Sequence, residues 1–229
     1  MLARTLRWMV LVAITLFVGY ELYVLGSVYW LRSNNPPSTA FMTAERERLS
    51  ALKPPVRIRQ TWVRYSAISP HAKRAVIAAE DSGFVDHEGI DWEAIEKAAR
   101  DNLEKGKIRR GGSTITMQLA KNLFLSPDRS LVRKGQEVII TTMLEALLEK
   151  RRILEIYLNV AEWGVGVFGI EAAAQHYFGV NAASLSAEQA AWLAAILPAP
   201  RRYDRNRGSG FIQSKTDTIL ARMPLVRVP

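Results

Sequence analysis

The sequence contains no cysteine in its 229 residues. A disulfide framework, a cysteine nucleophile and a zinc ribbon are therefore excluded, while an oxidising compartment remains compatible with the chain. Strand-like alternation is scarce, no internal repeat has solenoid spacing, and low-complexity sequence is confined to one short segment. These absences favour one folded domain of mainly α class, for which a hydrophobic content of 48% supplies a core.

Acidic residues are also in the minority, because 31 Lys and Arg face 22 Asp and Glu, a net charge of +9. This balance predicts an anionic partner such as nucleic acid, lipid head groups or phosphates. Residues 100–152 hold twelve basic and six acidic residues, so we expect the anion site there. No nucleic-acid recognition motif accompanies the basic composition, and we therefore expect no nucleic-acid partner.

The first 31 residues indicate a membrane anchor. Trp8 to Tyr20 is almost wholly apolar, and residues 22–31 add the Tyr and Trp typical of membrane interfaces. No small-x-small cleavage site follows, which favours an uncleaved anchor over a signal peptide. Glu21 interrupts the span at a cost of about 2.5 to 3.5 kcal/mol on insertion scales. We predict that it faces a partner helix. Arg residues flank both sides of the span, so their count leaves the orientation open.

Residues 32–55 are expected to form a linker, because Ser33 to Thr39 reads SNNPPST, a composition that resists helix and sheet. Capping residues and apolar spacing predict helices in the folded part that follows. We expect helices capped by Ser69 through Glu80, by Asp91 through about Leu103, by Ser113 from Thr114 through Phe124, and by Ser186 up to Pro198. The helical period runs from Leu131 to Asn159, which makes this the longest predicted helix.

Three groups of polar residues are candidates for chemistry, and each also has an ordinary structural explanation. In the first, Glu80 and Asp81 end an apolar helix, where acidic groups oppose the helix dipole. Phe84 and His87 follow in a turn punctuated by glycine. Glu80 is either a general acid or base or an ordinary surface carboxylate, and the spacing alone does not separate these readings.

The second group is GGSTITMQLAKN at residues 111–122, where a glycine pair leads into a helix whose free N–H groups could receive a phosphate. It lacks the lysine placement of a P-loop, and a capped helix with a polar face explains it as well. The third group is RKGQE at residues 133–137. Arg133 and Lys134 lie one helical turn from Glu137, a spacing that an ion pair worth about 0.2 to 0.5 kcal/mol also explains.

Five segments closely resemble, in order, the five motifs of the peptidoglycan glycosyltransferases. They read AAEDSGFVDHEGID, GGSTITMQLAKNLFL, RKGQEVIITTMLEALLEKRRILEIYLN, GVFGIEAAAQHYFG and LSAEQAAWLAAILPAP. The resemblance covers about Val56 to Met223 and is closest to the monofunctional branch. The same family forms the first domain of class A penicillin-binding proteins, but their transpeptidase half is missing. The only S-x-x-K match, Ser50 to Lys53, has no K-T-G partner, so we expect no transpeptidase activity.

The resemblance implies a lysozyme-like, two-lobed helical glycosyltransferase domain over residues 56–229. Residues 1–31 would form a cytoplasmic tip and a single transmembrane helix in the cytoplasmic (inner) membrane. The catalytic domain would lie on the periplasmic, extracytoplasmic side. The implied reaction polymerises lipid II into glycan strands by inverting transfer and releases undecaprenyl diphosphate. The implied partners are lipid II, the growing glycan strand, the membrane, and other cell-wall synthesis or division proteins.

The resemblance also implies roles for individual residues. Glu80 would be the general base for the acceptor 4-hydroxyl, and a carboxylate with a raised pKa suits that task. Glu137 would orient the donor or assist the leaving diphosphate, through a divalent ion (Mg or Mn) or nearby cations. No organic cofactor is implied. The implied substrate-binding residues are Asp81, Phe84, His87, Ser113, Thr114, Gln118, Lys121, Asn122, Arg129, Arg133 and Lys134. Lys121, Arg129 and Lys134 would hold the diphosphate.

Two positions depart from the family pattern. Met117 stands where many relatives have Gln, and Lys215 stands where an Arg is expected. Two other functions compete with glycosyl transfer. A lytic enzyme would also use a lysozyme-like cleft with one catalytic glutamate, but would not need cations for a diphosphate. A non-catalytic membrane scaffold would use the basic face alone, and would not need Glu80 and Glu137.

Overall fold

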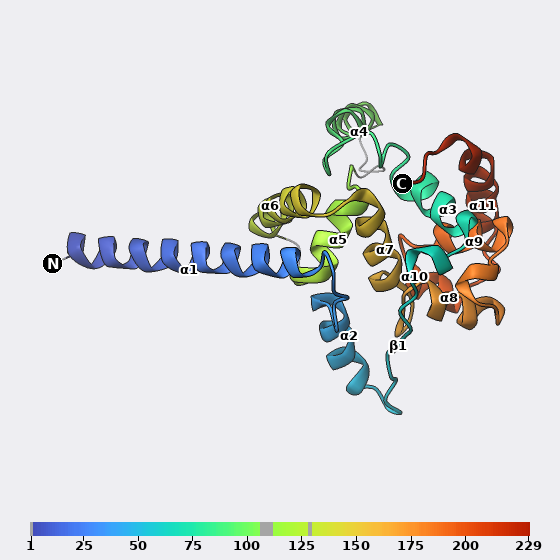
Figure 1. Ribbon diagram of the computed structural model, residues 1–229, viewed down its shortest axis with the longest axis horizontal. Helices are drawn as coiled ribbons and strands as arrows, with labels where there is room; N and C mark the ends of the chain where they lie inside the picture. Colours follow the sequence, from blue (N-terminus) through green and yellow to red (C-terminus); the bar gives the residue numbers. More distant parts are fainter. Residues whose placement is uncertain (1, 106–111, 128–129) are drawn as a thin grey trace.

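The computed structural model describes residues 2–105, 112–127 and 130–229 and is predominantly helical (Figure 1). The helices are α1 (Leu2–Trp30), α2 (Ala40–Ser50), α3 (Pro70–Glu80), α4 (Trp92–Lys105), α5 (Ile115–Phe124), α6 (Leu131–Leu147), α7 (Lys150–Val160), α8 (Ile170–Phe178), α9 (Ala187–Ile196), α10 (Pro200–Arg205) and α11 (Gly210–Arg222). Short strands β1 (Arg59–Gln60), β3 (Val167–Phe168) and β2 (Glu162–Gly164) form one small sheet in that order. The predicted mainly α class is confirmed.

Helix α1 projects from the folded body as a long rod (Figure 1). Its span Arg4–Trp30 has a mean hydropathy of 2.0 and is long and apolar enough to cross a membrane. Only its last turns pack against the domain, where Val24, Val28 and Leu31 are buried and α1 contacts α6. The N-terminal segment is therefore one continuous apolar helix, as the sequence predicts.

The folded body has two groups of helices. Helices α5, α6 and α7 pack on one another near the end of α1, and α2 packs against α5. Helices α3, α9 and α11 form the second group, at the end of the molecule farthest from the N-terminus (Figure 1). The chain passes between the two groups more than once. The end of α3 therefore lies beside α5, although the two helices are distant in sequence.

The predicted linker, residues 32–55, differs from the structure because α2 occupies much of it. Thr39 caps this helix by accepting a hydrogen bond of 3.1 Å from the backbone N–H of Met42. Met42 and Leu49 are buried, and Glu45 is buried in ion pairs with Arg48 and Arg201. Only the residues on either side of α2 remain without regular structure.

Most predicted helix starts agree with the structure. Ser69 caps α3 and Ser186 forms a full capping box with Gln189 at the start of α9. The carboxylate of Asp91 accepts a hydrogen bond of 2.8 Å from Ala94 at the start of α4. The predicted Ser113 cap is wrong, because the cap of α5 is Thr114, whose hydroxyl accepts from Met117 at 3.1 Å.

The predicted single helix from Leu131 to Asn159 is also wrong, because it breaks into α6 and α7. Leu148 and Glu149 adopt extended backbone conformations between the two helices. The Leu148 side chain turns into the core, and the Glu149 carbonyl accepts the first hydrogen bonds of α7. The apolar period continues through the break because both helices bury one face in the same core.

A buried asparagine joins α7 to the strand segment. The Asn159 side chain is fully buried, accepts from the backbone N–H of Val63 at 2.9 Å and donates to the Val63 carbonyl at 2.9 Å. Its backbone carbonyl accepts from Gln60 and lies against Gly169. Gly169 has φ +81°, and an added Cβ would lie 2.7 Å from the Asn159 oxygen. Only glycine fits this approach.

We expect Gly169→Ala to lower the free energy of unfolding by about 1 to 3 kcal/mol, because alanine would be strained at this φ and would displace the Asn159 backbone. Thermal unfolding in detergent, followed by circular dichroism, measures the change. Gly208→Ala is the matched control, since an added Cβ there meets nothing within 4 Å. Equal melting temperatures for the two variants would contradict the prediction.

Candidate active site

Glu80 is the last residue of α3 and lies at the meeting point of three helices. Its Oε2 accepts a hydrogen bond of 2.8 Å from the side-chain amide of Gln118 on α5. The Gln118 Oε1 in turn accepts from the Tyr157 hydroxyl on α7 at 2.9 Å. Tyr157 is fully buried, so its hydroxyl is immobile and holds the amide in one orientation. Glu80 is thereby positioned by a neutral donor.

Burial raises the pKa of Glu80 above its usual value. The hydrogen bond from Gln118 and the positive charges of Lys215 and Lys121 lower this pKa, and Asp81 raises it, but burial prevails. A carboxyl group with a raised pKa is a stronger base than an ordinary surface glutamate once it is ionised. The raised pKa of Glu80 is therefore a property that a general base requires.

Asp81 fixes the turn that follows Glu80. It is buried, its Oδ2 accepts from the backbone N–H of Ile115 at 3.0 Å, and its Oδ1 pairs with His87 Nε2 at 2.9 Å. The His87 Nδ1 accepts from the backbone N–H of Gly89 at 3.1 Å, so Nε2 carries the proton. Phe84 is fully buried. These three predicted site residues hold the shape of the turn beside Glu80.

The second predicted motif joins this turn to α5. The Thr114 hydroxyl donates to the Gly89 carbonyl at 2.6 Å, which explains why Thr114 rather than Ser113 begins the helix. Ser113 is exposed, and its hydroxyl accepts from Lys134 Nζ at 3.4 Å. Asn122 is nearly buried on α5. The second and third predicted motifs therefore meet at Ser113 and Lys134.

Glu137 is buried on α6 and is held by two cations. Its Oε2 pairs with Arg133 at 2.8 Å and its Oε1 pairs with Lys134 Nζ at 2.5 Å. These are the i,i+4 and i,i+3 pairs that the sequence predicts, but burial makes them stronger than exposed pairs on a helix surface. Glu137 thus forms two ion pairs, whereas Glu80 forms none among the described residues.

The charges of both Glu80 and Glu137 act on Lys121. Burial lowers its pKa, Glu137 and Glu80 raise it, and Arg133 and Lys134 lower it further. All four charges are therefore close enough to act on Lys121. The predicted cation Arg129 lies outside the described residues. Lys121, Arg133 and Lys134 lie close to Glu137, and their binding of a diphosphate stays a prediction.

Lys215 on α11 is a site residue that sequence reasoning noted only as a departure from the family pattern. Its Nζ donates to the carbonyl of Ala195 at the end of α9, at 3.2 Å, and its charge acts on Glu80. Burial lowers the pKa of Lys215, while Glu80 raises it. Because α11 is more than a hundred residues beyond α3, only the packing of these helices shows the contact.

A cavity of about 420 Å³ opens beside Glu80. Four of the predicted site residues line this cavity. The sequence did not predict that the other polar residues in its lining belong to the site. The predicted lining residues are Glu80, Asp81, Ser113 and Thr114, and the additional polar ones are Ser82, Asp91, Lys97 and Arg222. A molecule that occupied this cavity would contact Glu80 and the residues at the start of α5.

Comparison with known proteins shows which family the chain resembles along its length. A family model described as Transglycosylase matches residues 46–224. The chain is similar to proteins named biosynthetic peptidoglycan transglycosylase from Herminiimonas arsenicoxydans, at 55% identity, and from Janthinobacterium sp. (strain Marseille), at 53% identity. Both alignments cover 100% of this chain and 99% of the relative.

The chain belongs to the transglycosylase family. The resemblance in the five motifs is confirmed, and the protein is a glycosyltransferase enzyme. The match begins at residue 46, inside α2, so the family region includes part of the segment that the sequence suggested was a linker.

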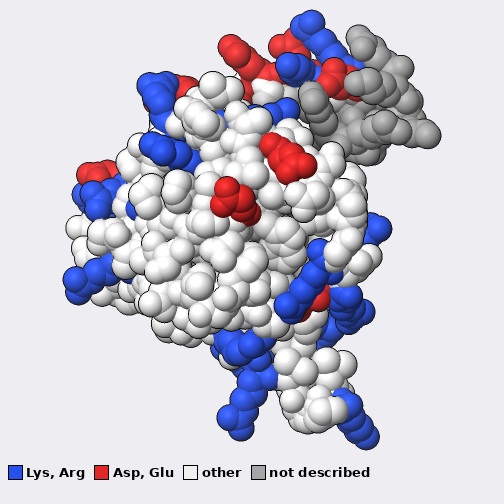
Figure 2. All heavy atoms as spheres, turned by 90° about the vertical axis from the view of Figure 1, so that its right-hand side faces the viewer, with Lys and Arg blue, Asp and Glu red and all other residues white. Residues whose placement is uncertain are grey.

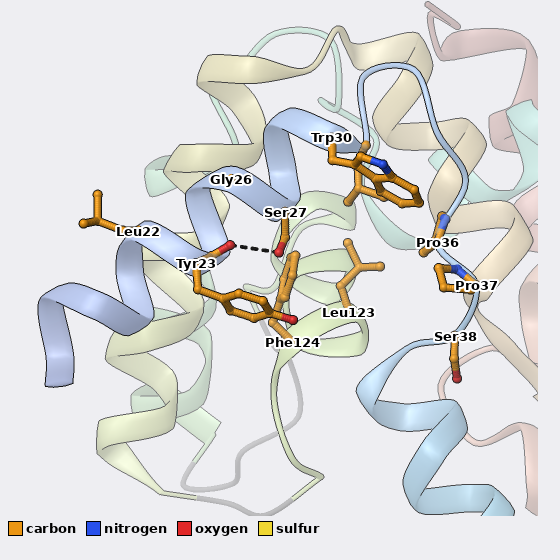
Figure 3. A pocket seen from close by; sticks show the side chains of 11 residues that line it. Leu22, Tyr23, Gly26, Ser27, Trp30, Pro36, Pro37, Ser38, Leu123 and Phe124 are labelled. Atoms are coloured by element: carbon orange, nitrogen blue, oxygen red, sulfur yellow. Dashed lines mark hydrogen bonds between the residues drawn. The ribbon is translucent and has the colours of Figure 1, made fainter.

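This transglycosylase also has an apolar groove of about 670 Å³ beside the C-terminal half of α1 (Figure 3). Side chains of α1, of the segment after it, and of α5 line the groove. The labelled lining residues are Leu22, Tyr23, Gly26, Ser27, Trp30, Pro36, Pro37, Ser38, Leu123 and Phe124. The Ser27 hydroxyl donates to the Tyr23 carbonyl at 2.8 Å, so its hydrogen is not available to a molecule in the groove. The groove suits an apolar chain.

Within the described part of the transglycosylase, one group of side chains could hold a metal ion. Asp81, His87 and Asp91 bring three ligand atoms within 4.8 Å of one another. The two carboxylates suit a divalent cation such as Mg or Mn. His87 would join them only after giving up the Nε2 proton that it shares with Asp81. No comparable group lies at Glu137 among the described residues, so the divalent ion expected at Glu137 stays a prediction.

The end of the molecule opposite the anchor carries few charged side chains (Figure 2). Lys and Arg lie along the margins of this face, and most of its visible surface is uncharged. Nucleic acid is bound by broad positive surfaces that follow its phosphates. This face has no such surface among the residues that are not drawn in grey, and the expectation of no nucleic-acid partner stays a prediction.

We expect Lys215→Met to raise the pKa of Glu80 further, because a nearby cation favours the ionised carboxylate and its removal favours the proton. The measurement is a pH titration of the side-chain carboxyl carbon in protein labelled with ¹³C-glutamate, assigned with Glu80→Gln. Lys215→Arg keeps the charge and should leave the titration midpoint close to that of the wild type. An unchanged midpoint in Lys215→Met would contradict the electrostatic contact.

Proposed function

We propose that this transglycosylase polymerises lipid II into peptidoglycan glycan strands, with Glu80 as the general base. The observation that carries the proposal is the placement of Glu80, whose pKa is raised by burial and whose carboxylate is oriented by Gln118 beside a cavity. The names of its relatives, which are similar over their whole length, support peptidoglycan as the product.

In the proposed step, Glu80 removes the proton from the 4-hydroxyl of the acceptor sugar. The oxygen attacks the anomeric carbon of the donor while the bond from that carbon to the diphosphate oxygen breaks. The bonding electrons leave with undecaprenyl diphosphate, and attack from the opposite face inverts the anomeric configuration. A sugar hydroxyl is a poor nucleophile. Removal of its proton by Glu80 makes the oxygen more nucleophilic as it attacks.

The leaving diphosphate needs positive charge, and the cluster around Glu137 offers it. Lys121, Arg133 and Lys134 carry three positive charges against the one negative charge of Glu137. Glu137 keeps two of these cations in fixed positions, while the excess charge remains for the substrate. Fixed charges aimed at a leaving group lower the barrier without reorganisation. Arg129, outside the described residues, is proposed as a further cation.

The anchor would place this chemistry at the membrane surface. Lipid II is confined to the bilayer, so a cleft tethered there meets it by diffusion in two dimensions. The apolar groove of Figure 3 supports binding of its isoprenoid chain. We propose the cytoplasmic membrane and an extracytoplasmic catalytic domain, because glycan strands are assembled outside that membrane. Contacts with other cell-wall synthesis or division proteins stay a prediction.

Glu80→Gln should reduce glycan formation at least about 100-fold, because the amide keeps the shape of the side chain but cannot take a proton. The assay is polymerisation of labelled lipid II in detergent, with products separated by length. Glu88→Gln is the matched control, since Glu88 is an exposed acid in the same turn. Full activity in Glu80→Gln would contradict the assignment of the base.

The same assay separates transfer from glycan cleavage. If the wild type made no polymer from lipid II but shortened preformed glycan, the lytic alternative would replace the proposal. If it did neither while remaining bound to lipid vesicles, the scaffold alternative would be favoured.

Lys121→Met should lower kcat/KM for lipid II about 10- to 100-fold, as expected for loss of a charge-assisted contact worth roughly 1.5 to 3 kcal/mol. Steady-state polymerisation rates at several lipid II concentrations measure this change. Lys53→Met removes an exposed lysine outside the cavity lining and should leave kcat/KM near the wild-type value. Equal kinetics for the two variants would show that Lys121 does not act on the substrate.

A further inference from the structure

Glu21 is a carboxylate in the apolar helix α1 that the proposed mechanism does not use. Its Oε1 accepts a hydrogen bond of 2.7 Å from the side-chain amide of Gln136 on α6. Its Oε2 is buried and has no hydrogen-bond partner within the described ranges. An ionisable group retained in a membrane helix calls for a functional explanation. Glu21 thus contacts a helix of its own chain, α6.

Glu21 belongs to the face of α1 that packs on the domain. Glu21, Val24, Val28 and Leu31 follow one another at spacings of three and four residues, the period of a helix–helix seam. The three apolar members are buried, and α1 contacts α6. Apolar side chains alone define register poorly in a membrane, because lipid is as apolar as they are. A polar pair in such a seam specifies one register.

The partner of Glu21 lies in the helix that carries the cation cluster. Gln136 directly precedes Glu137 and lies within one turn of Arg133 and Lys134. Successive residues of a helix point in different directions, so Gln136 faces the anchor while Glu137 faces its two cations. The hydrogen bond therefore joins the anchor to the element that would receive the diphosphate.

The hydrogen bond between Glu21 and Gln136 lies at a definite position along the apolar helix α1. Glu21 lies about 13 Å along the helix axis from Trp30, at 1.5 Å per residue. At the start of α6, Leu131 and Val132 are 92% and 85% exposed, so this end of the helix presents apolar side chains outward. A register shift of one turn between α1 and α6 would move the cations by about 5.4 Å relative to the anchor.

We propose that Glu21 is a positioning residue for glycosyl transfer: its hydrogen bond with Gln136 sets the depth of the cation cluster in the membrane to match the diphosphate of a bilayer-held substrate. The proposal rests on the proposed function. It follows that loss of the bond weakens binding of the membrane-embedded donor. Glu80 lies on α3, outside this seam, and continues to act as before.

Kinetics with two substrates test the proposal. Wild type, Glu21→Leu, Gln136→Leu and Glu21→Gln are reconstituted into vesicles of phosphatidylethanolamine and phosphatidylglycerol with labelled lipid II. The two leucine variants should raise KM about three- to tenfold, with kcat within about twofold, as expected when binding alone is lost. Glu21→Gln keeps an oxygen acceptor for Gln136 and should behave like the wild type. The leucine variants are more apolar, so failed insertion would not explain a loss.

A water-soluble lipid II analogue with a short chain, assayed in detergent, separates positioning from general damage. Its diphosphate has no fixed depth, so its KM should be unchanged in every variant. Thr15→Leu is the matched control in vesicles, because Thr15 bonds only to Leu11 of its own helix in the contacts of the described chain. Equal changes with both substrates, no change with either, or a Glu21→Gln variant as impaired as Glu21→Leu would overturn the proposal.

A distance measurement does not depend on activity. The chain has no cysteine, so spin labels can be attached to cysteines introduced at exposed Tyr23 on α1 and Val132 on α6. A narrow distance distribution that broadens in Glu21→Leu supports the fixed register, and the same distribution in both overturns it. If wild type made no polymer from either substrate, the proposed function would fail, while this measurement would still decide whether Glu21 sets the register.

Discussion

The Glu80 carboxylate accepts a hydrogen bond from Gln118, which accepts one from the buried hydroxyl of Tyr157. This short chain joins α3, α5 and α7, and the arrangement of the site depends on it. A buried carboxylate bound directly to a cation would ionise easily and be a weak base. Here a neutral amide orients the group, Lys215 and Lys121 act without forming ion pairs with it, and burial keeps the pKa raised.

The two glutamates show how one fold gives the same side chain two environments. Glu80 lies at a helix end beside a cavity, with a neutral donor. Glu137 is buried within α6, with one cation on each oxygen. The first environment suits the proposed general base, and the second suits the proposed binding of a diphosphate. The charges of both carboxylates act on Lys121 and raise its pKa. The separation of roles follows from burial and pairing rather than from residue type.

Local signals predicted local structure well and failed where packing decides. Ser69, Asp91 and Ser186 begin helices because each cap satisfies free N–H groups of the adjacent turn. Thr114 replaced Ser113 as a cap because its hydroxyl also reaches Gly89, a contact between distant segments. The break at Leu148 was hidden because apolar residues on both sides keep the helical period while facing one core.

The sequence by itself determined the apolar N-terminal helix, the mainly helical class, the pairs of Glu137 with Arg133 and Lys134, and the motifs that indicate the family. Each of these depends on residues that are near one another in the chain. The tertiary structure decided that Gln118 and Tyr157 orient Glu80, that Lys215 acts on it, and that Glu21 meets Gln136. These contacts join helices far apart in sequence, and their geometry exists only after the helices pack.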